Sequence, residues 1–194
     1  MNRSTKHADR VRRYVEALPR PVIATLGNHD HWSGAEAISA ALIQGGAEVL
    51  SNRASGIDGI GWVLDVVGVD DGTTKHADVE RAFRGVRRPE ESLVLNHFPA
   101  TADRIAKHGG RLILSGHTHG GQIVVPVLTE AVSRLFNGYF HGWYQIAESE
   151  LYVSAGIGHS LEGLRGGDSA IPEVAVYDLD PSAKRRESRF YRGA

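Results

Sequence analysis

The sequence predicts an α/β fold, in which helices pack on a mainly parallel sheet. Three short apolar runs, at residues 21–24, 92–95 and 111–115, have the continuous Val, Ile and Leu content that is typical of parallel strands buried on both faces. Segments with apolar residues at helical spacing lie between these runs. A chain that alternates between the two patterns favours helices layered on a sheet.

The N-terminal elements follow from residue spacing and from the residues that end helices. Residues 11–18 place apolar side chains three and four positions apart, which predicts a surface helix that the next proline ends. Residues 35–44 predict a second helix, closed by a Gly-Gly pair. A strand is expected around residues 48–51, and a longer β pair through residues 61–67.

The later elements continue this alternation. Helices over residues 78–83 and 101–107 each lead into one of the apolar strands. Three more strands are expected to form a second sheet: residues 122–125, 151–154 and 173–177. Because neither a linker nor an internal repeat is visible in the sequence, we expect a single domain over residues 1–180, followed by a polar tail over residues 181–194.

An aromatic stretch at residues 135–144 allows two interpretations. It can be a loop tucked under the core, which is the usual place for large apolar side chains. Alternatively it forms an apolar lip that meets acyl chains or a membrane surface. A peripheral membrane contact is therefore one expectation for this chain.

Composition is that of an ordinary globular domain. The chain has 194 residues, of which 41% are hydrophobic and 23% are charged, and its net charge is -1. This charge gives no overall field that would recruit nucleic acid, so nucleic acid is not an expected partner. The absence of cysteine excludes disulfides and thiolate metal ligands. As written, the chain is expected to be cytoplasmic, and exported or peripheral to a membrane if an N-terminal segment is missing.

Histidine-bearing polar segments follow all three apolar runs. Asn28 and His29 follow the first run, His97 follows the second, and His117 and His119 follow the third. In open α/β sheets a ligand site lies beyond the carboxyl ends of the strands, so the three junctions can converge. An amide oxygen with imidazole nitrogens suits Zn, Mn or Fe. Each residue also has an ordinary interpretation, as a turn, a helix cap or a hydrogen-bonding histidine.

The same segments resemble the ordered motifs of the calcineurin-like metallophosphoesterase superfamily. The sequence Gly27-Asn-His-Asp30 matches G-N-H-[DE], His97 matches a lone histidine near a proline, and Gly116-His-Thr-His119 matches G-H-x-H. The sequences of residues 120–123 and 151–158 resemble one branch, the bacterial phosphodiesterases related to UDP-2,3-diacylglucosamine pyrophosphatases. This resemblance implies a four-layer α-β-β-α sandwich.

The resemblance also implies roles for individual residues. Asn28, His97 and His117 would bind one divalent ion (Mn, Fe or Zn), and His119 would bind a second. His29 would face the phosphate and assist the leaving oxygen, with Asp30 holding its tautomer. The implied reaction is hydrolysis of a phosphodiester or pyrophosphate, in a small-molecule or lipid-linked substrate, by a water that the metals activate.

Two motifs of the superfamily, D-x-H and G-D-x-x-D, are not in this sequence. Only Asp9 precedes Gly27 among the aspartates, so we expect an N-terminally incomplete sandwich with one ion in place of two. The first hypothesis is a phosphoesterase whose competence depends on the missing motifs. The alternative is a truncated, non-catalytic remnant that binds one metal weakly or none. Asp70 or Asp71 is a further candidate for a carboxylate at the site.

Overall fold

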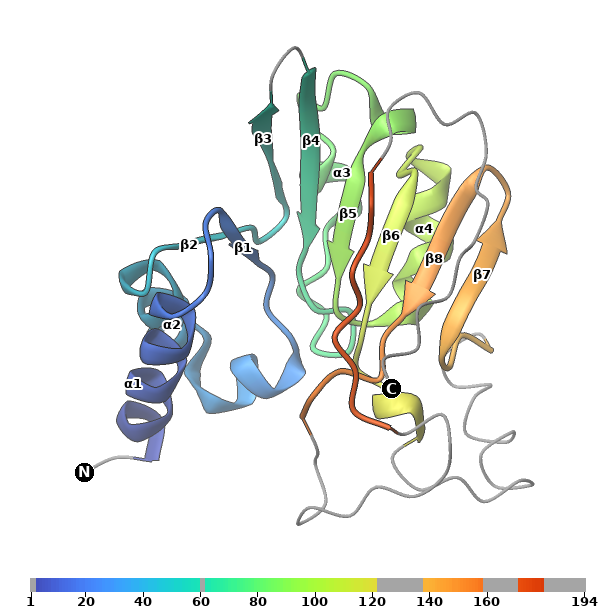
Figure 1. Cartoon of the computed structure of the whole chain (residues 1–194). Helices are drawn as coiled ribbons and strands as arrows, with labels where there is room; N and C mark the ends of the chain where they lie inside the picture. The colour runs from blue at the N-terminus through green and yellow to red at the C-terminus, as the bar shows by residue number, and fades with distance from the viewer. Residues whose placement is uncertain (1–2, 60–61, 122–137, 159–170, 180–194) are drawn as a thin grey trace.

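The computed structural model describes residues 3–59, 62–121, 138–158 and 171–179. Within them, the main sheet has six strands in the order β3-β4-β5-β6-β8-β7, and β1 and β2 form a separate two-stranded sheet (Figure 1). The main-sheet strands are β3 (Arg53–Gly59), β4 (Trp62–Val69), β5 (Leu93–Asn96), β6 (Leu112–Ser115), β7 (Gly142–Ile146) and β8 (Ser149–Val153). The predicted α/β class is confirmed.

The four central strands of the main sheet are parallel, and both edge strands are antiparallel to their neighbours. Val94 of β5 pairs with Ile113 of β6, which in turn pairs with Leu151 of β8. These three side chains are fully buried, as expected for parallel strands with apolar runs. The carboxyl ends of β5 and β6 therefore meet at one edge of the sheet, where the histidine-bearing segments begin.

Two helices, α3 (Val79–Ala82) and α4 (Ala102–Lys107), contribute the helical part of the main core. The side chains of Val79 and Ile105 are fully buried against the sheet residues. Figure 1 shows both helices on the same face of the sheet. The chain thus forms a mixed six-stranded sheet flanked by helices.

The N-terminal segment forms a smaller unit beside the β3 edge of the main sheet (Figure 1). Its elements are α1 (Arg3–Glu16), β1 (Val22–Ala24), α2 (Asn28–Gln44) and β2 (Ala47–Val49). Helix α1 packs on α2, and the buried cluster under α2 consists of Leu26, Ile38 and Val49. Thr25 links this unit to the main sheet, since its hydroxyl lies 2.9 Å from the carbonyl oxygen of Val69 and 3.1 Å from that of Leu50.

One expectation about the N-terminal unit is wrong, and one is extended. Strand β1 does not join the sheet of β5 and β6 but pairs only with β2 among the described strands. The expected helix over residues 35–44 is present as the part of α2 that follows the non-helical residue Gly34 (φ 105°), and a further helical segment from Asn28 precedes it. Asp30 accepts a hydrogen bond from the backbone N–H of Gly27 at the start of this earlier segment.

The predicted second sheet is also incorrect for the strand that the structure describes. Strand β8 includes residues 151–153 of the expected strand but lies in the main sheet between β6 and β7, because its apolar side chains complete the main core. Residues 173–177 carry no strand assignment. The expected strand at 122–125 and the tail at 181–194 lie outside the described residues.

The described part of the aromatic stretch packs inward. Tyr139 donates a hydrogen bond to Asp103 of α4, and the hydroxyl oxygen of Tyr144 accepts from the backbone N–H of Phe140. Trp143 lies against Tyr152 with ring centroids 4.8 Å apart. These contacts are those of a segment tucked against the sheet. Over the ranges that the structure describes, no helix is long and apolar enough to cross a membrane.

Candidate metal centre

His97 and His117 reach the site from the ends of two neighbouring strands. Strand β5 ends at Asn96, whose amide donates hydrogen bonds to the carbonyl oxygen of Phe98 (2.7 Å) and to Ser115 Oγ (3.1 Å). The backbone N–H of Gly116 donates to the carbonyl oxygen of His97. These bonds connect the turn after β5 with the turn after β6. The imidazoles of His97 and His117 are therefore held at one edge of the sheet.

Asn28 reaches the same point as the first residue of α2. Its side chain is buried, and its Oδ1 lies 2.9 Å from Nε2 of His97. The approach requires the glycine that precedes it, because a Cβ at Gly27 would lie 2.8 Å from the His97 ring. The glycine of the G-N-H-D motif therefore lets the start of α2 pack against the imidazole.

Two short distances connect these three side chains through His97. Nδ1 of His117 lies 3.2 Å from Nε2 of His97, and Nε2 of His97 lies 2.9 Å from Oδ1 of Asn28. Ligands bound about 2.1 Å from one ion, at octahedral to tetrahedral angles, lie about 3.0–3.4 Å apart. Across the described residues, no three His, Asp or Glu side chains are grouped to hold a metal, so the set depends on the amide of Asn28.

The G-H-T-H segment adopts a backbone that is uncommon for non-glycine residues. His117 has φ 70° and His119 has φ 53°, both in the left-handed region, where such conformations cluster at functional sites. A Cβ on Gly121 (φ 89°) would lie 2.2 Å from the Phe140 ring, so glycine is required there. His119 lies near Gly158, and its charge acts on both other imidazoles.

Burial keeps the paired imidazoles neutral. It lowers the pKa of His97 to about 4, with a further lowering from the charge of His117 and an opposing effect of Asp71. Burial also lowers the pKa of His117, again against Asp71. Neutral imidazole is the form that binds metals, so at neutral pH neither ring must lose a proton before it can act as a ligand.

His29 and Asp30, the predicted catalytic pair, have separate surroundings. His29 is exposed and makes an edge contact with Trp32, with ring centroids 5.0 Å apart. Asp30 Oδ2 accepts the Gly27 N–H at 2.8 Å, and burial raises the pKa of Asp30 although that bond opposes the shift. This bond helps to cap the start of α2, and the catalytic roles of His29 and Asp30 stay predictions.

A polar network, which the sequence did not predict, joins α2 to the end of β4. Nε2 of His31 lies 2.7 Å from Asp70 Oδ1, and Ser51 Oγ donates to Asp70 Oδ2 at 2.5 Å. The side chains of His31 and Asp70 are 11% and 6% exposed, so this contact is largely shielded from water. The only signal in the sequence was a histidine next to the G-N-H-D motif.

The charge of Asp71, the next residue, acts on both His97 and His117. Asp71 is fully buried, and its Oδ2 accepts hydrogen bonds from Thr73 Oγ1 (2.5 Å) and from Thr74 N (2.7 Å) and Oγ1 (2.8 Å). Burial favours the neutral acid, but these bonds and the charge of His97 outweigh it and lower the pKa of Asp71. The site therefore holds a carboxylate close to two neutral imidazoles.

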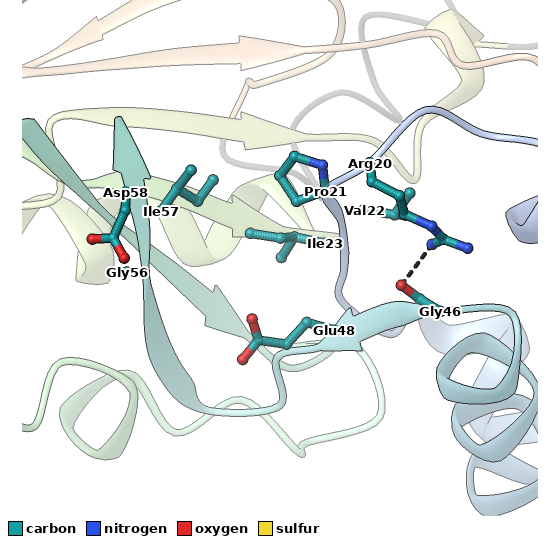
Figure 2. Close-up of a pocket in the computed structure, with 9 residues that line it drawn as sticks. All are labelled: Arg20, Pro21, Val22, Ile23, Gly46, Glu48, Gly56, Ile57 and Asp58. Carbon is teal, nitrogen blue, oxygen red and sulfur yellow. Dashed lines mark hydrogen bonds between the residues drawn. The ribbon is translucent and has the colours of Figure 1, made fainter. Parts of the chain in front are cut away.

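Two cavities lie outside this cluster. One of about 430 Å³ separates β1 and β2 from β3 and is lined by residues such as Ile23, Glu48 and Ile57. Figure 2 shows that Arg20, at one end of this cavity, donates to the carbonyl oxygen of Gly46. The other, of about 610 Å³, is more polar and is lined in part by Asp70. Neither contains Asn28, His97 or His117 among its lining residues.

Comparison with known proteins gives consistent results. Residues 2–121, more than half of the chain, match the calcineurin-like phosphoesterase family. The chain is 33% identical over 166 residues to Phosphodiesterase YaeI of Escherichia coli, a match that covers 82% of this chain and 58% of YaeI. It is 31% identical over 156 residues to the uncharacterised metallophosphoesterase YkuE of Bacillus subtilis, covering 79% and 54%.

A third relative is the UDP-2,3-diacylglucosamine pyrophosphatase LpxG of Chlamydia trachomatis, 30% identical over 104 residues, which are 49% of this chain and 32% of LpxG. The chain spans little more than half the length of YaeI and YkuE. No solved structure matches it. On the strength of the family match, the chain belongs to the calcineurin-like phosphoesterase family.

Proposed function

We propose that this chain binds one divalent cation through Asn28, His97 and His117, and that it forms part of a metal-dependent phosphoesterase. One observation carries the proposal: three metal-binding atoms from two separate parts of the fold meet at distances of 2.9 and 3.2 Å. All three groups are neutral ligands of the kind that Zn, Mn and Fe accept. The family to which the chain belongs consists of metal-dependent phosphoesterases.

Each residue of the site has a distinct task in this proposal. When bound, a divalent cation polarises a phosphoryl oxygen and makes a water more acidic. Asn28, His97 and His117 hold the cation at the sheet edge, and their neutrality at pH 7 leaves the lone pairs available. The exposed His29 gives a proton to the leaving oxygen. We assign His119 to the second ion of a complete site.

The substrate class that we propose is a phosphodiester or a pyrophosphate. Support comes from the names of two relatives, a phosphodiesterase and a UDP-2,3-diacylglucosamine pyrophosphatase. The substrate would be a small phosphate ester or a lipid-linked one. We further propose that the six-stranded sheet is one half of a four-layer sandwich, and that residues 1–180 belong to that single domain.

A second candidate function is metal binding without catalysis. It is favoured by the ligand set, because a two-metal site needs a bridging carboxylate and the motifs D-x-H and G-D-x-x-D are not in this sequence. In this alternative the chain binds one ion weakly or none, and it hydrolyses nothing.

Hydrolysis of bis(4-nitrophenyl) phosphate with Mn²⁺ separates the two candidates. The chain is compared with its His97→Ala variant and with a longer chain that adds the residues encoded upstream of Met1, where these carry the two absent motifs. Activity that requires His97 supports the phosphoesterase, in either chain. Mn²⁺ binding without hydrolysis in both chains supports the non-catalytic alternative, and absence of Mn²⁺ binding contradicts the metal centre itself.

A further inference from the structure

Asp71 is a buried carboxylate of which only one oxygen is satisfied. Its side chain is fully buried, and all three hydrogen bonds that it accepts go to Oδ2. Its Oδ1 is buried and has no hydrogen-bond partner within the part of the chain that the structure describes. Such an atom calls for a physical explanation, and an ion or an ordered water is the usual one.

Asp71 lies beside the segment that follows His97. The next residue, Gly72, packs so closely on the segment after His97 that a Cβ there would lie 2.9 Å from the Phe98 ring and 2.6 Å from Thr101 Oγ1. The charge of Asp71 acts on both His97 and His117. Asp70 points elsewhere, to His31 and Ser51, so the two adjacent carboxylates serve different parts of the molecule.

The charge balance of the proposed metal site suggests what the Asp71 carboxylate does. Asn28, His97 and His117 are all neutral, so an ion that they bind brings two uncompensated positive charges into a partly buried position. A buried charge is unfavourable unless an opposite charge lies nearby. We propose that Asp71 is the outer-sphere carboxylate of this centre, which compensates the charge of the ion without binding it directly. This inference rests on the proposed metal site.

The test measures metal affinity, independently of activity. The control for Asp71→Asn is Asp65→Asn. Asp65 lies on strand β4 and forms an ion pair with Arg87, so this variant removes the same charge at another place. We expect calorimetric titration with Mn²⁺ to show binding ~10- to 100-fold weaker in Asp71→Asn, the usual effect of losing an outer-shell partner, and unchanged binding in Asp65→Asn. The visible spectrum of bound Co²⁺ should shift only in Asp71→Asn.

A second variant separates charge from loop structure. The double variant Thr73→Val/Thr74→Val removes two hydroxyl donors from Asp71 but keeps the carboxylate. If the double variant binds Mn²⁺ as tightly as the wild type or more tightly, the result supports the proposal. This holds even when Asp71→Asn does not fold. A tenfold loss in the double variant would show that loop order sets the affinity and would overturn it, as would equal binding by Asp71→Asn and the wild type. A wild type that binds no Mn²⁺ would overturn the metal site itself.

Discussion

The two parts of the molecule that build the site differ in how firmly they are held. His97 and His117 extend from β5 and β6, in the centre of a six-stranded sheet whose core residues, such as Val94 and Ile113, are fully buried. Asn28 comes from a small unit with a two-stranded sheet and a minor apolar cluster. Two of the proposed ligands are thus fixed by a large core, whereas the third depends on a few polar contacts.

The largest difference between the two parts should appear in their stability. We expect Ile113→Ala to lower the free energy of unfolding by about 2–5 kcal/mol, since it leaves a cavity in the main core. Ile38→Ala in the N-terminal unit should cost about 2 kcal/mol, at the lower end of that range, because a small cluster can relax. Urea unfolding measures both values. Equal losses near the upper end would show that the N-terminal unit is as tightly packed as the sheet.

The sheet part should also be sensitive to pH in the metal-free state. The pKa of His97 falls from 6.5 to about 4 on folding, so the unfolded chain takes up a proton more readily. The contribution of neutral His97 to the free energy of unfolding is complete above pH 6.5. As the pH falls towards 4, the free energy of unfolding decreases by about 3 kcal/mol.

Urea unfolding of the metal-free protein at pH 7 and at pH 4 checks this prediction. The His97→Gln variant serves as the control, because it removes the titrating group. A wild type and a variant with the same pH dependence would mean that His97 does not govern acid stability.

Metal binding should depend unequally on the two histidines of the G-H-T-H segment. His117→Ala removes one of the three proposed ligands, and we expect at least ~100-fold weaker Mn²⁺ or Zn²⁺ binding, or ~2.7 kcal/mol. His119→Ala should change the affinity little, because the sequence lacks the motifs that would supply its partner ligands. Calorimetric titration compares the two variants. Equal losses would indicate a second ion held by residues that we have not identified.

The smallest expected effect concerns the link between the two parts. Thr25→Val removes the hydroxyl that lies within reach of two backbone carbonyls and should destabilise the fold by about 1 kcal/mol. Amide hydrogen exchange should show this destabilisation as faster exchange in α2, with exchange rates in β5 and β6 unchanged. Thr25→Ser keeps the hydroxyl and should behave as the wild type. Faster exchange in β5 as well would show that the N-terminal unit does not open separately.

The sequence predicted the α/β class and the sheet strands near the site because apolar runs and their polar ends are local signals. His97 lies 2.9 Å from Asn28 and 3.2 Å from His117. Their role as metal ligands stays a prediction. The order of strands was less predictable, since β8 joins the main sheet through pairing with β6, which is far away in the sequence.

Other features could not be found from local patterns. The helical segment before Gly34 has a hydrogen bond between Asp30 and Gly27 at its start, and residues of this type form simple turns equally well. The contact between His31 and Asp70 joins residues 39 positions apart, and a single histidine or aspartate gives no sign of such a partner. The sequence offered Asp71 only as one of two further candidates for a carboxylate at the site. Its burial and the missing hydrogen-bond partner of its Oδ1, within the described residues, are properties of the packing.

The central claim is that Asn28, His97 and His117 hold the same ion. X-ray absorption at the zinc edge of the Zn²⁺-loaded chain tests it directly, with His97→Ala as the matched control. We predict one ion per chain with two imidazole nitrogens and at least one oxygen at about 2.0–2.1 Å, and loss of one imidazole in the variant. A zinc environment that His97→Ala leaves unchanged would contradict this account.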